Sequence, residues 1–129
     1  MKLHHVAITV TDLEHSIAFY KNHFGFEEVK RFERSDLNGR AVFLALGDVR
    51  LELWEFKGLK VDHLAECPSL QRVGIRHIAF AVNNIKEECR RLLANGVEAS
   101  EPRMGASGGV YAFLSDPDGI QVELYQDEA

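Results

Sequence analysis

The stretch Arg76-His77-Ile78-Ala79-Phe80-Ala81-Val82 decides the fold, because residues 4–10 carry nearly the same pattern as His4-His5-Val6-Ala7-Ile8-Thr9-Val10. Read as strands, both alternate with a period of two, so bulky side chains lie on one face and small ones on the other. A bulky face suits packing on a helix, and a small face leaves a hollow. One histidine starts each small face, His5 in the first copy and His77 in the second. The pattern therefore predicts a histidine at the rim of a cavity in each half of the chain.

Landmarks of different kinds recur along the chain at one offset of 71 or 72 residues. They pair His5 with His77, Gly25 with Gly96, and Glu52 with Glu123. We therefore predict one domain, residues 1–129, made of two modules at about 1–56 and 75–126 and a linker at 57–74. Each module is too short to bury its own sheet face, so the two are expected to cover each other.

Each module is predicted to contain a strand, a helix and three further strands, which gives an α+β fold. In the first module a cap at Thr11-Asp12 and a stop at Gly25 bound the helix. Its later strands are expected at 26–32, 41–46 and 49–56, with Asn38-Gly39 as a hairpin turn. In the second module the helix follows Asn83-Asn84, and strands are expected at 97–100, 110–115 and 120–125. The apolar stripe of that helix is predicted to comprise Ile85, Cys89, Leu92 and Leu93.

Composition excludes several classes of function. The chain is 46% hydrophobic and 27% charged, with a net charge of -5 and a pI near 5.6, so we expect no nucleic-acid partner. No apolar run approaches the length of a membrane span, and no secretion signal is recognisable, so we expect no membrane partner and a cytoplasmic location. The two cysteines, Cys67 and Cys89, lack the spacing of a disulfide framework or a thiolate metal site.

The residues that carry chemistry are one histidine and one glutamate from each module. In the last strand of each module the aliphatic side chains point one way and the carboxylate, Glu52 or Glu123, points the other. If the two halves face each other, His5, Glu52, His77 and Glu123 converge as a mixed nitrogen and oxygen ligand set. Such a set suits one divalent ion, and Zn, Ni, Co, Fe and Mn are all admissible.

Other residues have a structural and a functional interpretation. A single histidine or glutamate on a strand is more often structural, and only the repeat favours the metal. By alternation His4 should point to the face opposite His5, which makes it a non-ligand. The segment 107–109, Ser-Gly-Gly, is either a turn or a set of backbone N–H groups for an anion. Trp54 and Phe56 either line a pocket or pack in the sheet.

Several motifs resemble the vicinal oxygen chelate superfamily, and within it the glyoxalase I-like members of the glyoxalase, bleomycin resistance protein and dioxygenase family. These motifs are the two His-x-Ala strands, the Gly-Gly before a strand, and residues 116–119, Asp-Pro-Asp-Gly, leading into Val122-Glu123-Leu124. The helix exit of the first module, with Ala18-Phe19-Tyr20 and Phe24-Gly25-Phe26, also matches. The resemblance implies a cupped eight-stranded mixed sheet around one divalent metal, with ligands at His5, Glu52, His77 and Glu123. It also implies a homodimer.

The activity implied by the resemblance is that of a metal-dependent lyase or isomerase of lactoylglutathione lyase type. Glu52 or Glu123 would take the proton alpha to a carbonyl, and the metal would chelate two vicinal oxygens of a small-molecule substrate as an enediolate forms. In bacterial glyoxalase I, an Arg and an Asn that contact glutathione match Thr9 and Phe56 here. Recognition of glutathione by those two residue types is therefore absent.

Two alternative functions occur within the same superfamily. The first is a binding protein for an aromatic or drug-like ligand, metal-free or metal-assisted, of the bleomycin-resistance type. The second is an iron-dependent extradiol dioxygenase. One fold hosts all of these activities, so the fold by itself does not choose between them.

Overall fold

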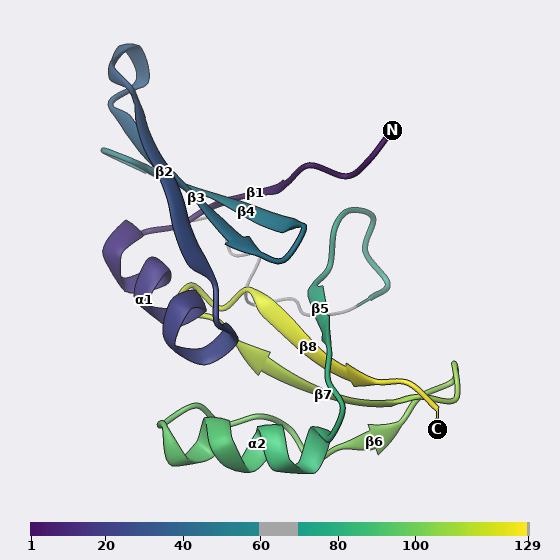
Figure 1. Ribbon diagram of the computed structural model, residues 1–129. Coiled ribbons are helices and arrows are strands. Elements are labelled where there is room, and N and C mark those ends of the chain that lie inside the picture. The colour runs from purple at the N-terminus through teal and green to yellow at the C-terminus, as the bar shows by residue number, and fades with distance from the viewer. Residues whose placement is uncertain (60–69, 129) are drawn as a thin grey trace. The chain divides into compact units, whose positions relative to one another are not determined.

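The computed structural model of the protein describes residues 1–59 and 70–128. The chain divides into two compact units, residues 1–62 and 63–129, which are called here the first unit and the second unit. Each unit contains one predicted module with a strand, a helix and three strands, so the α+β fold of two such modules is confirmed (Figure 1). The linker predicted at 57–74 falls partly outside the described residues.

The first unit is a four-stranded mixed sheet with one long helix. Its elements are β1 (Val6–Thr9), α1 (Leu13–Phe24), β2 (Glu27–Arg34), the 3₁₀ turn η1 (Ser35–Leu37), β3 (Gly39–Leu46) and β4 (Val49–Phe56). The strands are ordered β1-β4-β3-β2, with β1 parallel to β4 and the other neighbours antiparallel. The predicted hairpin turn is present, because Asn38 adopts the left-handed conformation between β2 and β3.

The second unit repeats this topology with shorter elements. It contains β5 (Ile78–Ala81), α2 (Ile85–Ala94), β6 (Arg103–Met104), β7 (Val110–Ser115) and β8 (Gln121–Gln126). The strand order is β5-β8-β7-β6, and β5 is parallel to β8. The described strands thus pair as two four-stranded sheets, one in each unit. Their union into a single eight-stranded sheet stays a prediction.

The predicted strand at 97–100 is wrong, and the edge strand β6 begins only at Arg103. The backbone N–H of Ser100 donates to the carbonyl of Phe113, as a strand residue would. The return bond does not reach the Ser100 carbonyl, because the N–H of Phe113 donates to the Ser100 hydroxyl instead. A side chain has taken the place of the backbone acceptor, and the ladder stops there.

The core of each unit lies between its helix and the bulky face of its sheet. In the first unit, Leu13, Ile17 and Tyr20 of α1 are buried, together with Val42, Leu44, Leu51 and Leu53 of the sheet. In the second unit the buried set is Ile85, Leu92, Ala112, Leu114, Val122 and Leu124. Alternation along β4 and β8 then places the side chains between these leucines and valines on the opposite face.

The predicted stripe on α2 is only partly correct. Ile85 and Leu92 are buried and Cys89 is half-buried, but Leu93 is 61% exposed. Consecutive residues on a helix point about 100° apart, and here the side of α2 that carries Leu92 is buried while the side that carries Leu93 is exposed. Burial raises the pKa of the Cys89 thiol, and the nearby carboxylates of Glu101 and Glu88 raise it further.

A hydrogen bond from the helix N-terminus to a side chain of the last strand recurs in both units. The predicted caps are present, with Asp12 accepting from the N–H of His15 and Asn84 from that of Glu87. In addition, Glu55 at the end of β4 accepts from the N–H of Leu13 at 2.6 Å. Gln126 at the end of β8 accepts in the same way from Ile85 at 2.9 Å. These two contacts fix the start of each helix against the last strand of its unit.

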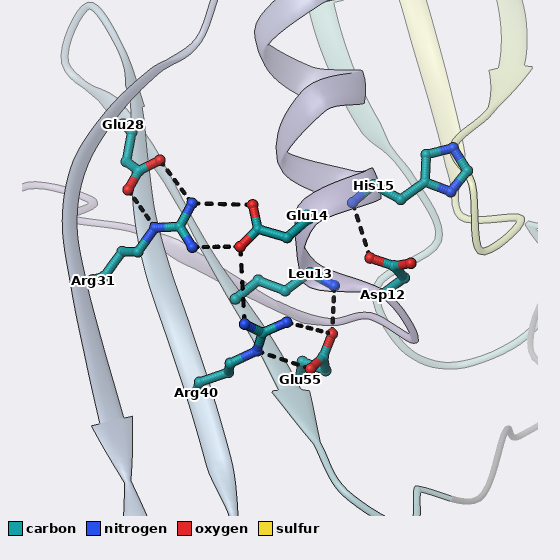
Figure 2. A network of polar contacts seen from close by, with 8 residues as sticks. All are labelled: Asp12, Leu13, Glu14, His15, Glu28, Arg31, Arg40 and Glu55. Carbon is teal, nitrogen blue, oxygen red and sulfur yellow. Dashed lines mark hydrogen bonds and ion pairs between the residues drawn. The ribbon is translucent and has the colours of Figure 1, made fainter.

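Figure 2 shows the ion-pair network that surrounds this contact in the first unit. The Arg40 Nε donates to Glu55, and the Arg31 guanidinium bridges Glu14 of α1 and Glu28 of β2. The hydrogen bonds from Arg40 and then from the Leu13 N–H lower the pKa of Glu55. The Arg31 hydrogen bonds likewise lower the pKa of Glu14 and Glu28.

Among the described residues, no helix is both long and apolar enough to cross a membrane.

Candidate functional site

The strand registers bring a histidine, a phenylalanine and a glutamate together in each unit. Glu52 in β4 pairs with Ala7 of β1 on one side and with Phe43 of β3 on the other. In the second unit Glu123 pairs in the same way with Ala79 and Phe113. Paired residues on neighbouring strands share a face of the sheet, and the small alanine leaves room beside each carboxylate. The small-residue face predicted from the sequence therefore exists in both halves.

In the first unit His5 lies directly before β1 and reaches Glu52. The His5 Nε2 and the Glu52 Oε2 are 3.6 Å apart. The imidazole packs edge-on against the Phe43 ring, with ring centroids 5.2 Å apart. The His5 side chain is 35% exposed and that of Glu52 is 14% exposed, so both remain within reach of a small molecule.

In the second unit His77 and Glu123 form the matching pair. The His77 Nε2 lies 3.0 Å from the Glu123 Oε2, and the imidazole packs edge-on against Phe113 with centroids 5.2 Å apart. The His77 side chain is 25% exposed and that of Glu123 is 14% exposed. Each unit thus brings together the histidine and the glutamate that the repeat predicts for it.

The sequence pattern did not single out Phe43 or Phe113, although each packs against the histidine of its unit. A signal was present, because the two phenylalanines are separated by 70 residues and each lies on the strand before the one that carries the glutamate. Their rings back the two imidazoles and limit the directions in which each Nε2 can point.

A family model described as the Glyoxalase/Bleomycin resistance protein/Dioxygenase superfamily matches residues 2–124. The chain belongs to this superfamily. It is 30% identical to a lactoylglutathione lyase of Salmonella typhimurium over 98% of this chain and 93% of that protein. It is 33% identical to the mitochondrial methylmalonyl-CoA epimerase of Bos taurus over 97% of this chain and 74% of the relative. A glyoxalase family protein from Enterococcus faecalis superposes with a TM-score of 0.83 at 30% identity, covering 96% of each chain.

Members of the glyoxalase superfamily are often metal-dependent, and the donor atoms of each pair are spaced as two ligands of one ion would be. Two ligand atoms about 2.1 Å from an ion lie ~3.0 Å apart at a right angle and ~3.4 Å apart at a tetrahedral angle. The observed separations are 3.6 Å in the first unit and 3.0 Å in the second. Imidazole nitrogen with carboxylate oxygen is also a donor set that suits Zn, Ni, Co, Fe and Mn. The residues of each pair therefore fit a divalent ion.

Within residues 1–59 and 70–128, no group of three or more His, Cys, Asp or Glu side chains gathers as a metal site. Each unit supplies two donors, and the four-ligand set of this glyoxalase superfamily member remains a prediction for the assembled protein.

The predicted orientation of His4 is wrong. The His4 Nδ1 lies 2.8 Å from the His5 Nδ1, and the Phe43 ring contacts both imidazoles. Alternation does not apply here because β1 begins only at Val6. The His4 Nε2 is 2.8 Å from a guanidinium nitrogen of Arg50, which can only donate. A neutral His4 then carries its proton on Nδ1 and donates it to His5, which leaves the proton of a neutral His5 on Nε2, facing Glu52.

The two glutamates differ in how they are held. The Glu52 Oε1 accepts a short hydrogen bond from the indole N–H of Trp54. In the second unit the residue matching Trp54 is Tyr125, whose hydroxyl bonds to the Ser107 hydroxyl at 2.6 Å rather than to Glu123. Among the described residues, the interaction found for the Glu123 carboxylate is that with His77. Glu52 is therefore fixed from two sides and Glu123 from one.

Residues 107–109 behave as a turn. The Gly108 N–H donates to the Gly105 carbonyl at 3.1 Å, and the Gly105 N–H donates to the Gly109 carbonyl at 2.8 Å. A Cβ on Gly109 would overlap the phenol of Tyr125, so the glycine allows the close approach of that ring. The backbone donors at 105 and 108 are used within the turn, which favours the structural interpretation.

Trp54 and Phe56 form an aromatic surface on the first unit. Their rings stack with centroids 5.3 Å apart and an interplanar angle of 8°, and Phe32 meets Trp54 edge-on. All three side chains come from β2 and β4 and belong to the same side of the sheet as Glu52, since every second residue of β4 shares a face.

Proposed function

We propose that the protein is a divalent-metal-dependent enzyme of the glyoxalase I type, a lyase or isomerase that moves a proton at the carbon alpha to a carbonyl. The observation that carries this proposal is the His and Glu pair in each unit, with donor separations of 3.6 and 3.0 Å. The similarity to a lactoylglutathione lyase and to a methylmalonyl-CoA epimerase supports an enzyme of this kind.

His5, Glu52, His77 and Glu123 would hold the metal. When bound, a divalent ion supplies a positive charge that orients two adjacent substrate oxygens and stabilises the negative charge that develops on them. The two phenylalanines behind the imidazoles keep the histidines in place. The alanines beside the carboxylates leave the space that the substrate would occupy.

Glu123 is the better general base of the two glutamates. A base must turn toward the substrate carbon, take its proton and return it to the neighbouring carbon. For Glu52 this movement breaks the bond from the Trp54 indole, whereas Glu123 carries no such restraint among the described side chains. Glu52 is accordingly assigned to holding the ion and Glu123 to proton transfer.

Metal analysis is the first test. Purified protein should bind one Ni, Co, Zn, Mn or Fe ion per site, and H77Q should lower that occupancy. H15Q is the matched control, because His15 is an exposed histidine of α1 outside the pairs. Wild-type protein that binds no divalent ion would overturn the proposal.

Turnover should then be assayed with hemithioacetals of methylglyoxal and several thiols, because Thr9 and Phe56 stand where glutathione-binding residues are expected. E123Q should abolish turnover while metal binding persists, and E52Q should weaken metal binding. The reverse pattern would exchange the two assigned roles.

A complementation experiment decides whether a site is built within one chain or across a homodimer. One chain carries H5Q and E52Q, and the other carries H77Q and E123Q. If the two units of one site come from different subunits, the mixed dimer holds one intact set of ligands and regains metal binding. If both units come from one chain, mixing restores nothing.

A second candidate is a binding protein for an aromatic ligand, which the stacked Trp54 and Phe56 favour. Stacking on such a surface needs no metal. Quenching of the fluorescence of Trp54, the single tryptophan, by aromatic compounds in metal-free protein would support this candidate.

A further inference from the structure

A cavity beside His77 has the chemistry of an oxyanion site. It lies within the second unit and has a volume of about 300 Å³. Its lining includes His77, Ser100, Arg103, Tyr111, Phe113 and Gln121. Of these residues, His77 belongs to the candidate metal pair and Phe113 packs on its imidazole, so a molecule in the cavity would touch His77 directly.

The strand register places a cation and a phenol side by side at one end of this cavity. Arg103 in β6 lies opposite Tyr111 in β7, and Tyr111 lies opposite Tyr125 in β8. Residues directly opposite each other in an antiparallel pair point to the same side of the sheet. The Arg103 guanidinium and the Tyr111 hydroxyl therefore present their hydrogen-bond donors to the same space.

The Arg103 guanidinium is not neutralised by the part of the chain that the structure describes. Arg31, Arg34, Arg40 and Arg91 each pair with at least one carboxylate. Arg103 has no such carboxylate within 1–59 and 70–128, and over the same residues the Tyr111 hydroxyl makes no hydrogen bond. A planar guanidinium with five donors matches the two oxygens of a carboxylate.

The first unit shows that the fold does not require a cation at this position. There Trp54 pairs with Ala41, and Ala41 pairs with Phe32, which is the counterpart of Arg103 across the repeat. Phe32 packs on Trp54 and Phe43. One topological position thus carries an aromatic ring in one unit and an arginine in the other, so the arginine serves something other than the packing of the sheet.

We propose that Arg103 and Tyr111 bind a carboxylate of the substrate while the reacting carbons lie against His77 and Glu123. The proposal rests on the proposed function for the identity of the reacting end, and it adds the substrate class, a small carboxylate-bearing carbonyl compound. Arg103 lies two strand spacings across the sheet from Tyr125, and Glu123 lies two residues along β8 from Tyr125. The Cα atoms of Arg103 and Glu123 are therefore ~12 Å apart. One arginine side chain and a substrate of a few carbons span that distance together.

The binding test uses metal-free protein, so that chelation by a metal cannot contribute. Malonate, inorganic phosphate and the neutral analogue malonamide are titrated separately and followed by two-dimensional ¹H–¹⁵N NMR. Malonate should shift the Arg103 Nε resonance and the amides of β6 and β7, and malonamide should not. R103Q should weaken malonate binding about tenfold or more, and R103K should weaken it less.

R90Q is the matched control, because Arg90 is an exposed arginine of α2 away from the cavity. Malonate affinity that is unchanged in R103Q, or lost equally in R90Q, would overturn the proposal. Binding of phosphate without malonate would also overturn it, because the site would then not select a carboxylate. A protein that binds malonate through Arg103 but no divalent metal would contradict the proposed enzyme and leave the oxyanion site standing.

In turnover assays R103Q should raise KM for substrates that carry a carboxylate and leave KM for a neutral hemithioacetal unchanged. A loss of kcat for both substrates would indicate a structural defect, and would contradict a role in binding the carboxylate.

Discussion

Replacement of Glu55 tests how the start of α1 is held against the sheet. The Glu55 Oε2 accepts from the Leu13 N–H at 2.6 Å, and Leu13 is 1% exposed. E55L leaves that partly buried N–H without its acceptor, which costs about 1–3 kcal/mol. E55Q keeps an oxygen in place, as Gln126 does for Ile85 in the second unit. E55Q keeps an oxygen acceptor and loses only the negative charge, so it should cost about 1 kcal/mol of unfolding free energy. E55L removes the acceptor as well and should cost about 2 kcal/mol.

Urea unfolding at pH 7, followed by the fluorescence of Trp54 and by circular dichroism, measures both losses. Q126L and Q126E provide the same comparison at the other helix. An E55Q protein as unstable as E55L would show that charge, and not the hydrogen bond to Leu13, holds the helix. An E55L protein as stable as the wild type would refute the capping role altogether.

Comparison of the wild type with E55Q also gives a prediction for the pH dependence of stability. The pKa of Glu55 is lowered in the folded protein by the Arg40 hydrogen bond and by the Leu13 N–H. Because the pKa is lowered, the Glu55 carboxylate stabilises the fold at pH values above its ordinary pKa of about 4.3. This stabilisation is lost as the pH falls through the lower pKa of the folded protein. The stability difference between wild type and E55Q should therefore shrink below about pH 4.3. A difference that is constant from pH 7 to 3 would contradict this linkage.

Three further substitutions and probes follow from the described contacts. R50Q removes the donor that holds His4 and a positive charge near the site, so we expect several-fold tighter Zn²⁺ binding, measured by competition with a chelator. Burial raises the pKa of Cys89, so iodoacetamide should alkylate it slowly at pH 8 in the folded protein and quickly in urea, as peptide mass spectrometry would show. G109A forces a methyl group into the phenol of Tyr125 and should cost about 1–3 kcal/mol in thermal or urea unfolding.

Much of the fold could be predicted because the sequence contains an internal repeat. The alternation in 4–10 and 76–82 fixed the faces of β1 and β5, and the repeat of Glu52 at Glu123 placed the two carboxylates on matching strands. A landmark in one half has a counterpart of the same kind in the other half, so the two halves indicate the same order of elements. Apart from the shifted edge strand β6, the order of strands and helices in both units was therefore predictable.

The features that could not be predicted depend on single side chains. Such a side chain either replaces a backbone hydrogen-bond acceptor or lies outside a strand. The Ser100 hydroxyl accepts a bond that a strand would give to a carbonyl, and no periodic pattern contains that choice. His4 precedes β1, so the rule that turns successive side chains to opposite faces does not govern it. The association of Phe43 with His5 required the strand register, which becomes visible only once β3 and β4 are paired.

The two units keep the same pair of a histidine and a glutamate and differ in what surrounds that pair. The Trp54 indole donates to Glu52, whereas the Tyr125 hydroxyl bonds to Ser107 and not to Glu123, and Phe32 in one sheet corresponds to Arg103 in the other. A binding scaffold for an apolar ligand gains nothing from two histidine and glutamate pairs on partly exposed strands. A catalyst gains from both features, because identical donors suit one ion while unlike surroundings distinguish the two ends of a small, asymmetric substrate. The difference between Glu52, held from two sides, and Glu123, held from one, follows from the same divergence, and exchanging Trp54 and Tyr125 should exchange the proposed roles of the two carboxylates.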